Sequence, residues 1–423
     1  MSFQQGLSGL SSSARALDVI SSNVANSSTV GFKSSSTLFA DTYASALSGV
    51  RSSVQVGAGS SVTAVRQSFS QGNVTSTNNP LDMAINGNGF FMIERNNGTT
   101  AYSRNGQFDL DRDGYIVTPL GERLMGYQTV NPDGSVTLTG TGTPVPIYIP
   151  PQGIAPSATQ GDQGASLRAN LDSAAAAPAT TPFDQADPDS YNFTTSMRIY
   201  DSQGNDHTLS FYFVKAAAPA LNQWEVHASI NGGATGTPPV QLDFGPTGRL
   251  LATSASTMAI DASFPGADLS NTTGAEDLEF TVNFAGLTQE SSPFSVSELR
   301  QNGFPPGQIA GVSVSADGII QGRYTNGQTQ SLGQVVLATF RSTNGLASLG
   351  DNLWGETSES GQPAVGIPGT GLNGTLASAR VEESNVDLSQ ELVQMIIAQR
   401  NYQANAQSIR TQDQILQTLI NLR

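Results

Sequence analysis

Cysteine is absent from the 423-residue sequence, lysine and histidine occur twice each, and charged residues make up only 13% of the chain. Without cysteine there is no disulfide, no thiolate metal site and no thiol nucleophile. With two lysines and no matching glycine-rich or GxSxG motif, no P-loop, Schiff-base site or nucleophile elbow can be assembled. These absences give little support to an enzyme, and we expect no catalytic residue and no cofactor.

Long hydrophobic runs are also absent. No stretch of about 18 apolar residues could cross a bilayer as a helix. The first residues, MSFQQGLSGLSSSARALDVI, lack the basic region and the continuous apolar region of a cleaved secretory signal. If the protein works outside the cell, we expect it to leave by a route that reads an uncleaved, non-hydrophobic segment.

The histidines give a metal site little support. His207 and His227 lie twenty residues apart on expected strands. A metal-binding or catalytic pair is the weaker interpretation of these two residues, and ordinary polar positions of a strand are the better one.

A short acidic segment has part of a calcium-binding pattern. Asp109, Asp111 and Asp113, followed by Gly114, match the first half of a calcium loop. Position twelve is Leu120, where such a loop requires a bidentate glutamate. A turn built on Asp-Gly explains the same residues, so we expect no metal site, and calcium at the three aspartates stays an open alternative.

The charge that is present lies mainly in the middle of the chain. The net charge is −15, and residues 151–284 hold 14 acidic and four basic side chains, a net of −10. Residues 386–423 carry three of each sign. An acidic surface repels nucleic acid and anionic lipid, so we expect neither as a partner. Neutral ends can pack against copies of themselves without like-charge repulsion.

Residues 4–26 have the periodicity of an amphipathic helix. Apolar side chains recur at alternating spacings of three and four, which places them in a narrow stripe on one face. The serines between them are only middling helix formers, so this helix needs a partner. The stripe comprises Leu7, Leu10, Ala14, Leu17, Ile20 and Val24.

The C-terminal segment is more regular. Asp387 can cap the N-terminus of a helix that runs to about Asn421. Seven-residue spacing over five heptads predicts a coiled-coil-like seam about 50 Å long. Gln399 and Asp413 weaken the second row, so the seam is not that of an optimised permanent dimer. Docking of this helix on its own domain would explain the seam about equally well. The rows are Leu388, Met395, Tyr402, Ile409 and Leu416, and Leu392, Gln399, Ala406, Asp413 and Ile420.

Between the helices, the sequence consists of short strands and turns. Residues 82–93 and 101–128 have strand patterns separated by Gly-containing turns. A proline-rich passage at 144–190 marks a boundary, and residues 309–341 return to strands and turns. We expect a mainly β, multidomain protein with N- and C-terminal helical arms that pair as a coiled coil, an inner β-domain and an inserted outer β-domain.

The two ends therefore share a pattern: both are amphipathic, neutral and long. Two such arms can pair and still present an apolar edge to other subunits. Because the arms differ, contacts between copies would be heterologous, which generates open helical filaments and not closed dimers. The residues expected in the self-assembly interface are Leu7, Leu10, Leu17, Ile20, Val24, Leu388, Leu392, Met395, Tyr402, Ile409, Leu416 and Ile420.

Segments at opposite ends of the chain match a known family. Residues 21–33, SSNVANSSTVGFK, resemble the N-terminal signature of flagellar rod and hook proteins, and residues 387–407, DLSQELVQMIIAQRNYQANAQ, resemble the C-terminal one. Residues 81–93 and 102–121 are similar to the family's shared β-domain. The two signatures rest on Asn23, Asn26, Gly31, Phe32, Lys33, Gln399, Arg400, Tyr402 and Asn405.

The resemblance implies a division of the chain into parts. The expected parts are a helical arm (1–33), a connecting segment (34–70), the first part of the inner β-domain (71–149), the inserted outer β-domain (150–284), the second part of the inner β-domain (285–359), a second connecting segment (360–385) and a helical arm (386–423). Several glycines in the connecting segments favour a hinge-rich conformation there.

Length and architecture distinguish the members of this family. Distal rod proteins look similar at both ends but are much shorter, and hook–filament junction proteins lack a close match to residues 303–354. An inserted domain followed by that block resembles the hook subunit. A secreted β-rich adhesin is a weaker alternative, because it would explain the acidic middle but not the two ordered end motifs.

The resemblance also implies a function. A hook subunit polymerises into a flexible helical tube that couples rod to filament and transmits torque in motility. Its implied partners are copies of itself, the distal rod protein, the hook–filament junction protein, the hook cap scaffold and the flagellar type III export apparatus. Its implied location is the hook of the extracellular bacterial flagellum, reached without cleavage of a signal peptide.

Overall fold

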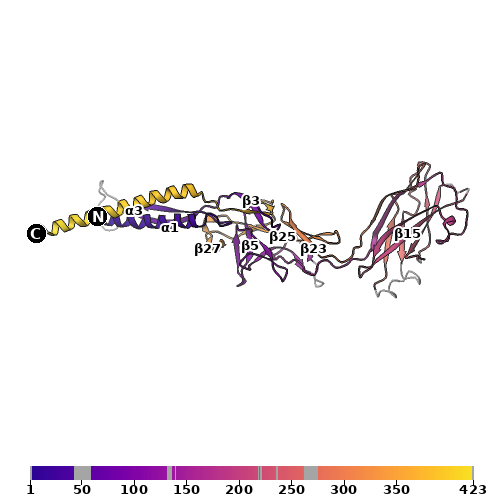
Figure 1. Ribbon diagram of the computed structural model, residues 1–423, viewed down its shortest axis with the longest axis horizontal. Helices are drawn as coiled ribbons and strands as arrows, with labels where there is room; N and C mark the ends of the chain where they lie inside the picture. Colours follow the sequence, from indigo (N-terminus) through magenta and orange to yellow (C-terminus); the bar gives the residue numbers. More distant parts are fainter. Residues whose placement is uncertain are drawn as a thin grey trace. The chain divides into compact units, whose positions relative to one another are not determined.

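The computed structural model describes residues 2–41, 59–130, 136–138, 140–217, 219, 222–234, 237–261 and 275–421. The chain divides into two compact units, each with its own strands (Figure 1). The first comprises Met1–Pro151, Gly311–Arg323 and Thr329–Arg423, and the second, called the inserted domain below, comprises Gln152–Ala310 and Tyr324–Gln328. The described helices include none long and apolar enough to cross a membrane.

The first unit begins and ends with helices that form the arms. Helix α1 (Ser2–Ala25) and helix α3 (Leu388–Asn421) lie side by side and antiparallel, so that both chain ends lie at the same end of the pair (Figure 1). The Asp387 carboxylate accepts hydrogen bonds from the backbone N–H groups of Ser389 (2.9 Å) and Gln390 (3.1 Å), which confirms the expected N-terminal cap of α3. The hairpin of β1 (Ser35–Asp41) and β2 (Ser60–Gln67) packs against α1.

The rest of the first unit is the inner β-domain. Its central sheet follows the order β23-β24-β25-β9-β5-β6-β28-β27, so strands from before the insertion lie between strands from after it. Phe90, Tyr102, Ala338 and Trp354 form part of its core. Its strands are β3 (Val74–Ser76), β4 (Met83–Asn86), β5 (Phe90–Glu94), β6 (Thr100–Ser103), β7 (Asp109–Leu110), β8 (Ile116–Val117), β9 (Arg123–Tyr127), β10 (Thr129–Val130), β11 (Val136–Thr137), β12 (Val145–Pro146), β23 (Ile309–Val314), β24 (Ile319–Tyr324), β25 (Thr329–Val335), β26 (Leu337–Thr339), β27 (Ala347–Gly350), β28 (Leu353–Gly355), β29 (Ala364–Gly366), β30 (Thr375–Ser378) and β31 (Arg380–Glu382).

The inserted domain consists of two sheets that share one hydrophobic core, which includes Phe211, Phe213, Trp224 and Phe284. One sheet has the strand order β19-β20-β13-β21, and β22 also pairs with β13. The other sheet has the strand order β14-β15-β16-β17, and β18 also pairs with β16. The elements are β13 (Gly161–Asp172), η1 (Pro188–Ser190), β14 (Phe193–Tyr200), β15 (Asp206–Lys215), β16 (Gln223–Ile230), β17 (Gly233–Ala234), β18 (Val240–Asp243), β19 (Thr257–Asp261), β20 (Glu279–Asn283), β21 (Thr288–Glu290) and β22 (Ser295–Gln301).

The architecture confirms the expected fold class, a mainly β protein with helical arms, but the segments between its parts differ from the expectation. The inserted domain continues to Ala310, beyond the expected end at 284, because β21 and β22 pair with β13. In the segment 34–70, β1 and β2 belong to the arms, and residues 42–58 lie outside the described ones. The segment 360–385 contains β29, β30 and β31, which pair with strands of the inner β-domain.

Candidate functional site

The two arm helices approach each other closely because α1 carries glycine at the contact. A Cβ atom on Gly9 would lie 2.7 Å from Nδ2 of Asn405, and one on Gly6 would lie 3.0 Å from Cγ1 of Ile409. The side chains of Asn405 and Ile409 therefore pack directly on the backbone of α1. Ala398, one heptad before Asn405, is buried with 7% of its surface exposed. Small and polar residues thus form much of the seam within the chain.

This seam uses only part of the predicted heptad rows. The expected interface residues differ widely in exposure, because contact with α1 follows the row that contains Ala398 and Asn405. Ile20 is buried; Leu10, Leu17, Val24, Met395 and Ile409 are half-buried; Leu7, Leu388, Leu392, Tyr402 and Leu416 are exposed; and the side chain of Ile420 lies outside the described ones.

Large apolar side chains of α3 remain exposed as a consequence. Leu388, Leu392 and Ile396 follow one another at four-residue spacing, so they form one stripe on the helix surface. Val393 and Ile397 lie beside that stripe. These five residues, called the arm ridge below, are exposed to between 44% and 57%. A contiguous exposed apolar patch of this kind is typical of a protein–protein interface.

At the other end of α1, signature residues form the turn into β1. Asn23 is 1% exposed, and its side-chain amide donates to Ser35 O (2.8 Å) and to Glu391 Oε1 (3.0 Å), which ties α1 to α3. Asn26 donates from Nδ2 to Ser22 O (2.9 Å) in the last turn of α1. Gly31 has a φ of +73°, and a Cβ there would lie 2.5 Å from the backbone N of Asn105. Both its conformation and its surroundings therefore require glycine.

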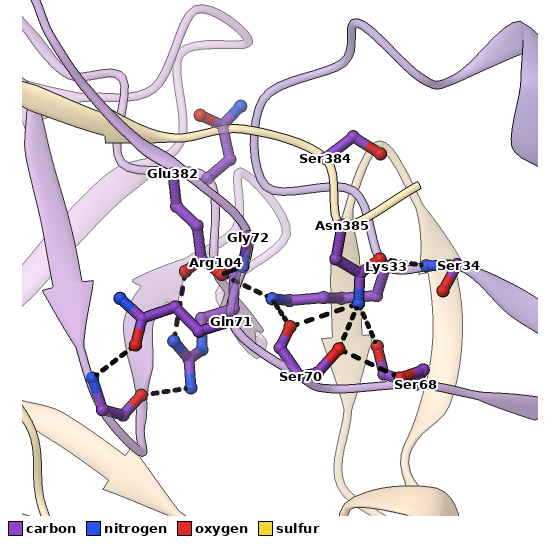
Figure 2. A network of polar contacts seen from close by, with 12 residues as sticks. Lys33, Ser34, Ser68, Ser70, Gln71, Gly72, Arg104, Glu382, Ser384 and Asn385 are labelled. Carbon is purple, nitrogen blue, oxygen red and sulfur yellow. Dashed lines mark hydrogen bonds and ion pairs between the residues drawn. The ribbon is translucent and has the colours of Figure 1, made fainter. Parts of the chain in front are cut away.

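The signature lysine forms part of a buried ionic cluster (Figure 2). Lys33 Nζ donates to Glu382 Oε1 at 2.6 Å and to Ser70 O at 2.7 Å. Arg104 Nη1 donates to Glu382 Oε2 at 3.1 Å, and the N–H of Gly72 donates to Glu382 Oε1 at 2.8 Å. The side chains of Lys33 and Glu382 are 0% exposed and that of Arg104 is 4% exposed. Burial lowers the pKa values of Lys33 and Arg104, and the adjoining Glu382 carboxylate opposes that decrease.

Asn385 extends this cluster toward α3 (Figure 2). Its Oδ1 accepts from the backbone N–H of Ser34 at 2.7 Å, and its Nδ2 donates to Ser68 O at 2.8 Å and to Ser70 O at 3.2 Å. Lys33, Ser70, Gly72, Arg104, Glu382 and Asn385 are together called the arm joint below.

The sequence did not predict Glu382, Arg104 or Asn385 as site residues. Lys33 itself was a usable signal for this cluster. A lysine side chain that is buried requires a carboxylate nearby, so a glutamate or aspartate partner could have been expected. The neighbouring Glu382 and Glu383 could not be distinguished without the register of β31, which points Glu382 inward and leaves Glu383 exposed.

The remaining signature residues are at the surface or partly buried. Gln399, Arg400 and Tyr402 are exposed on α3, away from the seam, whereas Asn405 lies in it. Phe32 is half-buried beside Trp354 and Asn352.

The other candidate residues have structural contacts. Asp111 Oδ1 accepts from the backbone N–H groups of Asp113 (2.7 Å) and Tyr115 (3.1 Å), which closes the turn between β7 and β8. His207 Nε2 lies 3.2 Å from Asp201 Oδ2, and the His227 ring stacks on Phe183 at 4.1 Å between centroids. Among the described residues, no group of three or more His, Asp or Glu side chains is arranged to hold a metal ion.

Comparison with known families covers most of the chain. Residues 3–33 match the flagella basal body rod protein family, and residues 84–160 match the flagellar hook protein FlgE/F/G D1 domain. Residues 170–304 match the flagellar basal body protein FlaE D2 domain, and residues 377–422 match the C-terminal family of flagellar basal body rod FlgEFG proteins.

Individual relatives match over the full length. The chain is 41% identical over 430 residues to flagellar hook protein FlgE of Escherichia coli, with 100% of both chains covered. It is 41% identical over 428 residues to FlgE of Salmonella typhimurium, again with 100% of both covered. It is 33% identical over 425 residues to FlgE of Rhizobium meliloti, with 99% of this chain and 98% of that one covered. The chain therefore belongs to the flagellar hook protein family.

Proposed function

We propose that this chain is a structural subunit that polymerises through its arms into the helical tube of the bacterial flagellar hook. The observation that carries the proposal is the arm ridge. Its five large apolar side chains are 44% to 57% exposed although their helix is already packed on α1. Covering such a ridge removes apolar surface from water, which stabilises association by about 25 cal/mol for each Å².

The chemistry of the arms favours an open polymer. The ridge lies on α3, whereas a groove of about 540 Å³ lies between α1, β1 and α3 and includes Ala16, Val19 and Phe39 in its lining. Ile397 belongs to both, but the other four ridge residues do not line the groove, so a ridge that enters a neighbour's groove makes a heterologous contact. Repetition of a heterologous contact that does not close generates a helical filament.

The same assignment defines the expected surroundings of the subunit. As a hook subunit it is extracellular, is exported by the flagellar type III apparatus without cleavage and is assembled under the hook cap. It joins the distal rod protein to the hook–filament junction protein and carries torque without catalysing a reaction. Support for this assignment comes from the full-length relatives, which are flagellar hook proteins.

Replacement of two ridge residues by polar ones tests assembly directly. The double variant Leu392→Gln/Ile396→Gln is expected to be secreted and folded but to form no tubes. The two residues are 44% and 51% exposed, so their replacement is expected to cost the isolated subunit little stability. Electron microscopy of hooks prepared from cells that carry only this variant, and swimming in soft agar, measure the effect.

A matched control is Leu372→Gln. Leu372 is 79% exposed and lies outside the arms, between β29 and β30, so tubes are expected to form normally. Normal tubes from the double ridge variant would refute assembly through the ridge.

A further inference from the structure

Three segments at the base of the arms meet at the arm joint. Residues 26–35 connect α1 to β1, residues 67–73 connect β2 to β3, and residues 382–387 connect β31 to α3. Any change in the direction of the arms relative to the inner β-domain has to move these segments against one another. Contacts among the three segments therefore determine whether this part of the molecule bends.

Glu382 contacts both other segments and the inner β-domain at once. Its carbonyl oxygen accepts from the N–H of Gly31 at 2.8 Å. Its carboxylate accepts from Lys33 in the first segment, from Gly72 in the second, and from Arg104 in the loop after β6 (Figure 2). Asn385 adds a second set of hydrogen bonds among the same three segments.

Burial makes these contacts hard to exchange for water. Two cationic side chains share one carboxylate, and Arg104 Nε has no hydrogen-bond partner within the described residues. Loss of the carboxylate would leave two cations close together in a site without solvent access, where an unpaired charge is strongly unfavourable. Separation of the first segment would break the pair of Lys33 with Glu382 and meet the same penalty, and separation of the second would leave the buried hydrogen bonds of Gly72 and Ser70 unmade, so the joint resists opening.

We propose that Glu382 is a positioning residue that locks the three segments together, so that the arms and the inner β-domain move as one body. This proposal rests on the proposed function, because the rigidity matters where a subunit carries torque through its arms. It replaces the hinge expected from the glycines of the connecting segments: flexing during function takes place outside the arm joint.

Amide hydrogen exchange of the full-length chain tests this local role. In Glu382→Gln, the amides of Gly31, Ser34 and Gly72 are expected to exchange at least about tenfold faster, since each donates to Glu382 or Asn385. The amides of β15 in the inserted domain are expected to be unchanged. Unchanged exchange at the three segments would overturn the proposal, and so would uniform acceleration throughout the first unit, which indicates only a general loss of stability.

Two further variants keep the experiment decisive. Glu122→Gln is the matched control, because Glu122 is 6% exposed and pairs with Arg95 at 3.2 Å within the inner β-domain, outside the joint. It is expected to leave exchange at the three segments unchanged. Should Glu382→Gln fail to fold, Glu382→Asp keeps the charge but withdraws it by one methylene group, and a smaller local acceleration is expected at the same amides.

Cells that carry Glu382→Asp connect the joint to function. They are expected to assemble tubes but to swim more slowly than cells with the unaltered chain, and normal swimming together with faster exchange at the joint would refute the role in torque. The proposed function fails separately: if the unaltered chain forms no tubes, assembly is refuted whatever the exchange shows. If tubes form and Glu382→Gln leaves exchange unchanged, only the joint proposal fails.

Discussion

Large apolar side chains are buried in the inserted domain but exposed on the arms. In the inserted domain, Trp224, Phe211 and Phe213 are 0% exposed within a core shared by two sheets. In the arms, the ridge residues are exposed to between 44% and 57%. A region with its own core can fold without partners, whereas the ridge is left uncovered in the single subunit. The contrast separates a self-sufficient domain from the surface proposed for assembly.

The exposure of charged side chains also differs between the two regions. The arm joint buries Lys33, Arg104 and Glu382, while the ion pair of Arg168 and Glu298 in the inserted domain is 62% and 32% exposed. Exposed pairs of this kind contribute at most about 1 kcal/mol. Buried ones are sensitive to the loss of a single partner. The first unit thus holds an ionic cluster at its interior, whereas the buried charged side chains of the inserted domain, Asp201 and Lys215, contact His207 and backbone carbonyls.

The largest expected effect comes from a substitution in the core of the inserted domain. Trp224→Ala removes a fully buried ring that stacks on Phe193 at 5.8 Å and donates to Gln289, so we expect a loss of about 3–5 kcal/mol in the free energy of unfolding. Urea denaturation followed by circular dichroism measures it. The control Leu251→Ala, at a residue 43% exposed, is expected to change stability by less than about 0.5 kcal/mol. Equal effects of the two would contradict a self-sufficient core.

A smaller effect is expected where the arm helices touch. Gly9→Ala places a Cβ 2.7 Å from the side-chain amide of Asn405, which has to leave its position in the seam. The lost packing is partly offset by the higher helix propensity of alanine, so we expect a net loss of stability of at most about 1 kcal/mol. The helical signal of the arms is expected to melt at a lower temperature. The double variant Gly9→Ala/Asn405→Ala removes the obstructing amide and should recover part of the loss. No recovery would show that the close contact is not the cause.

The smallest expected effect is a pH dependence in the inserted domain. Burial lowers the pKa of His227 below its ordinary value of 6.5, and nearby Glu225 opposes this only in part. The unfolded chain therefore binds a proton first as pH falls below 6.5, and the free energy of unfolding decreases from there toward the lower folded pKa. His227→Gln should make stability less dependent on pH in that window. Urea midpoints at pH 7.5 and below 6.5 measure it, and an unchanged slope would refute this contribution.

Much of the fold could be predicted because its signals are local. The spacing of Leu10, Leu17 and Val24 predicted α1, and Asp387 predicted the start of α3. The face of α3 that meets α1 was harder to predict from the sequence. Heptad spacing identifies the apolar rows of a helix, but it does not show which row a partner helix covers. The seam follows Ala398 and Asn405, since glycines on α1 admit a close backbone approach there.

The end signatures could be located in the sequence, but their roles could not. Gly31 and Lys33 stand out as a motif, yet nothing near them in the chain indicates what they contact. Gly31 needs its left-handed backbone beside Asn105, and Lys33 needs a carboxylate at the far end of the chain. Pairing of β3 with β31 brings that carboxylate into place.

The amino-acid sequence by itself determined the two amphipathic arms, the β-rich middle and the family signatures, because each depends on spacing or composition within a short stretch. Tertiary structure alone decided which side chains of α3 remain exposed and which glutamate meets Lys33. That pair is separated by 349 positions in the chain. Contacts of such length follow from strand register and burial, and neither is encoded in the residues on one side of the pair.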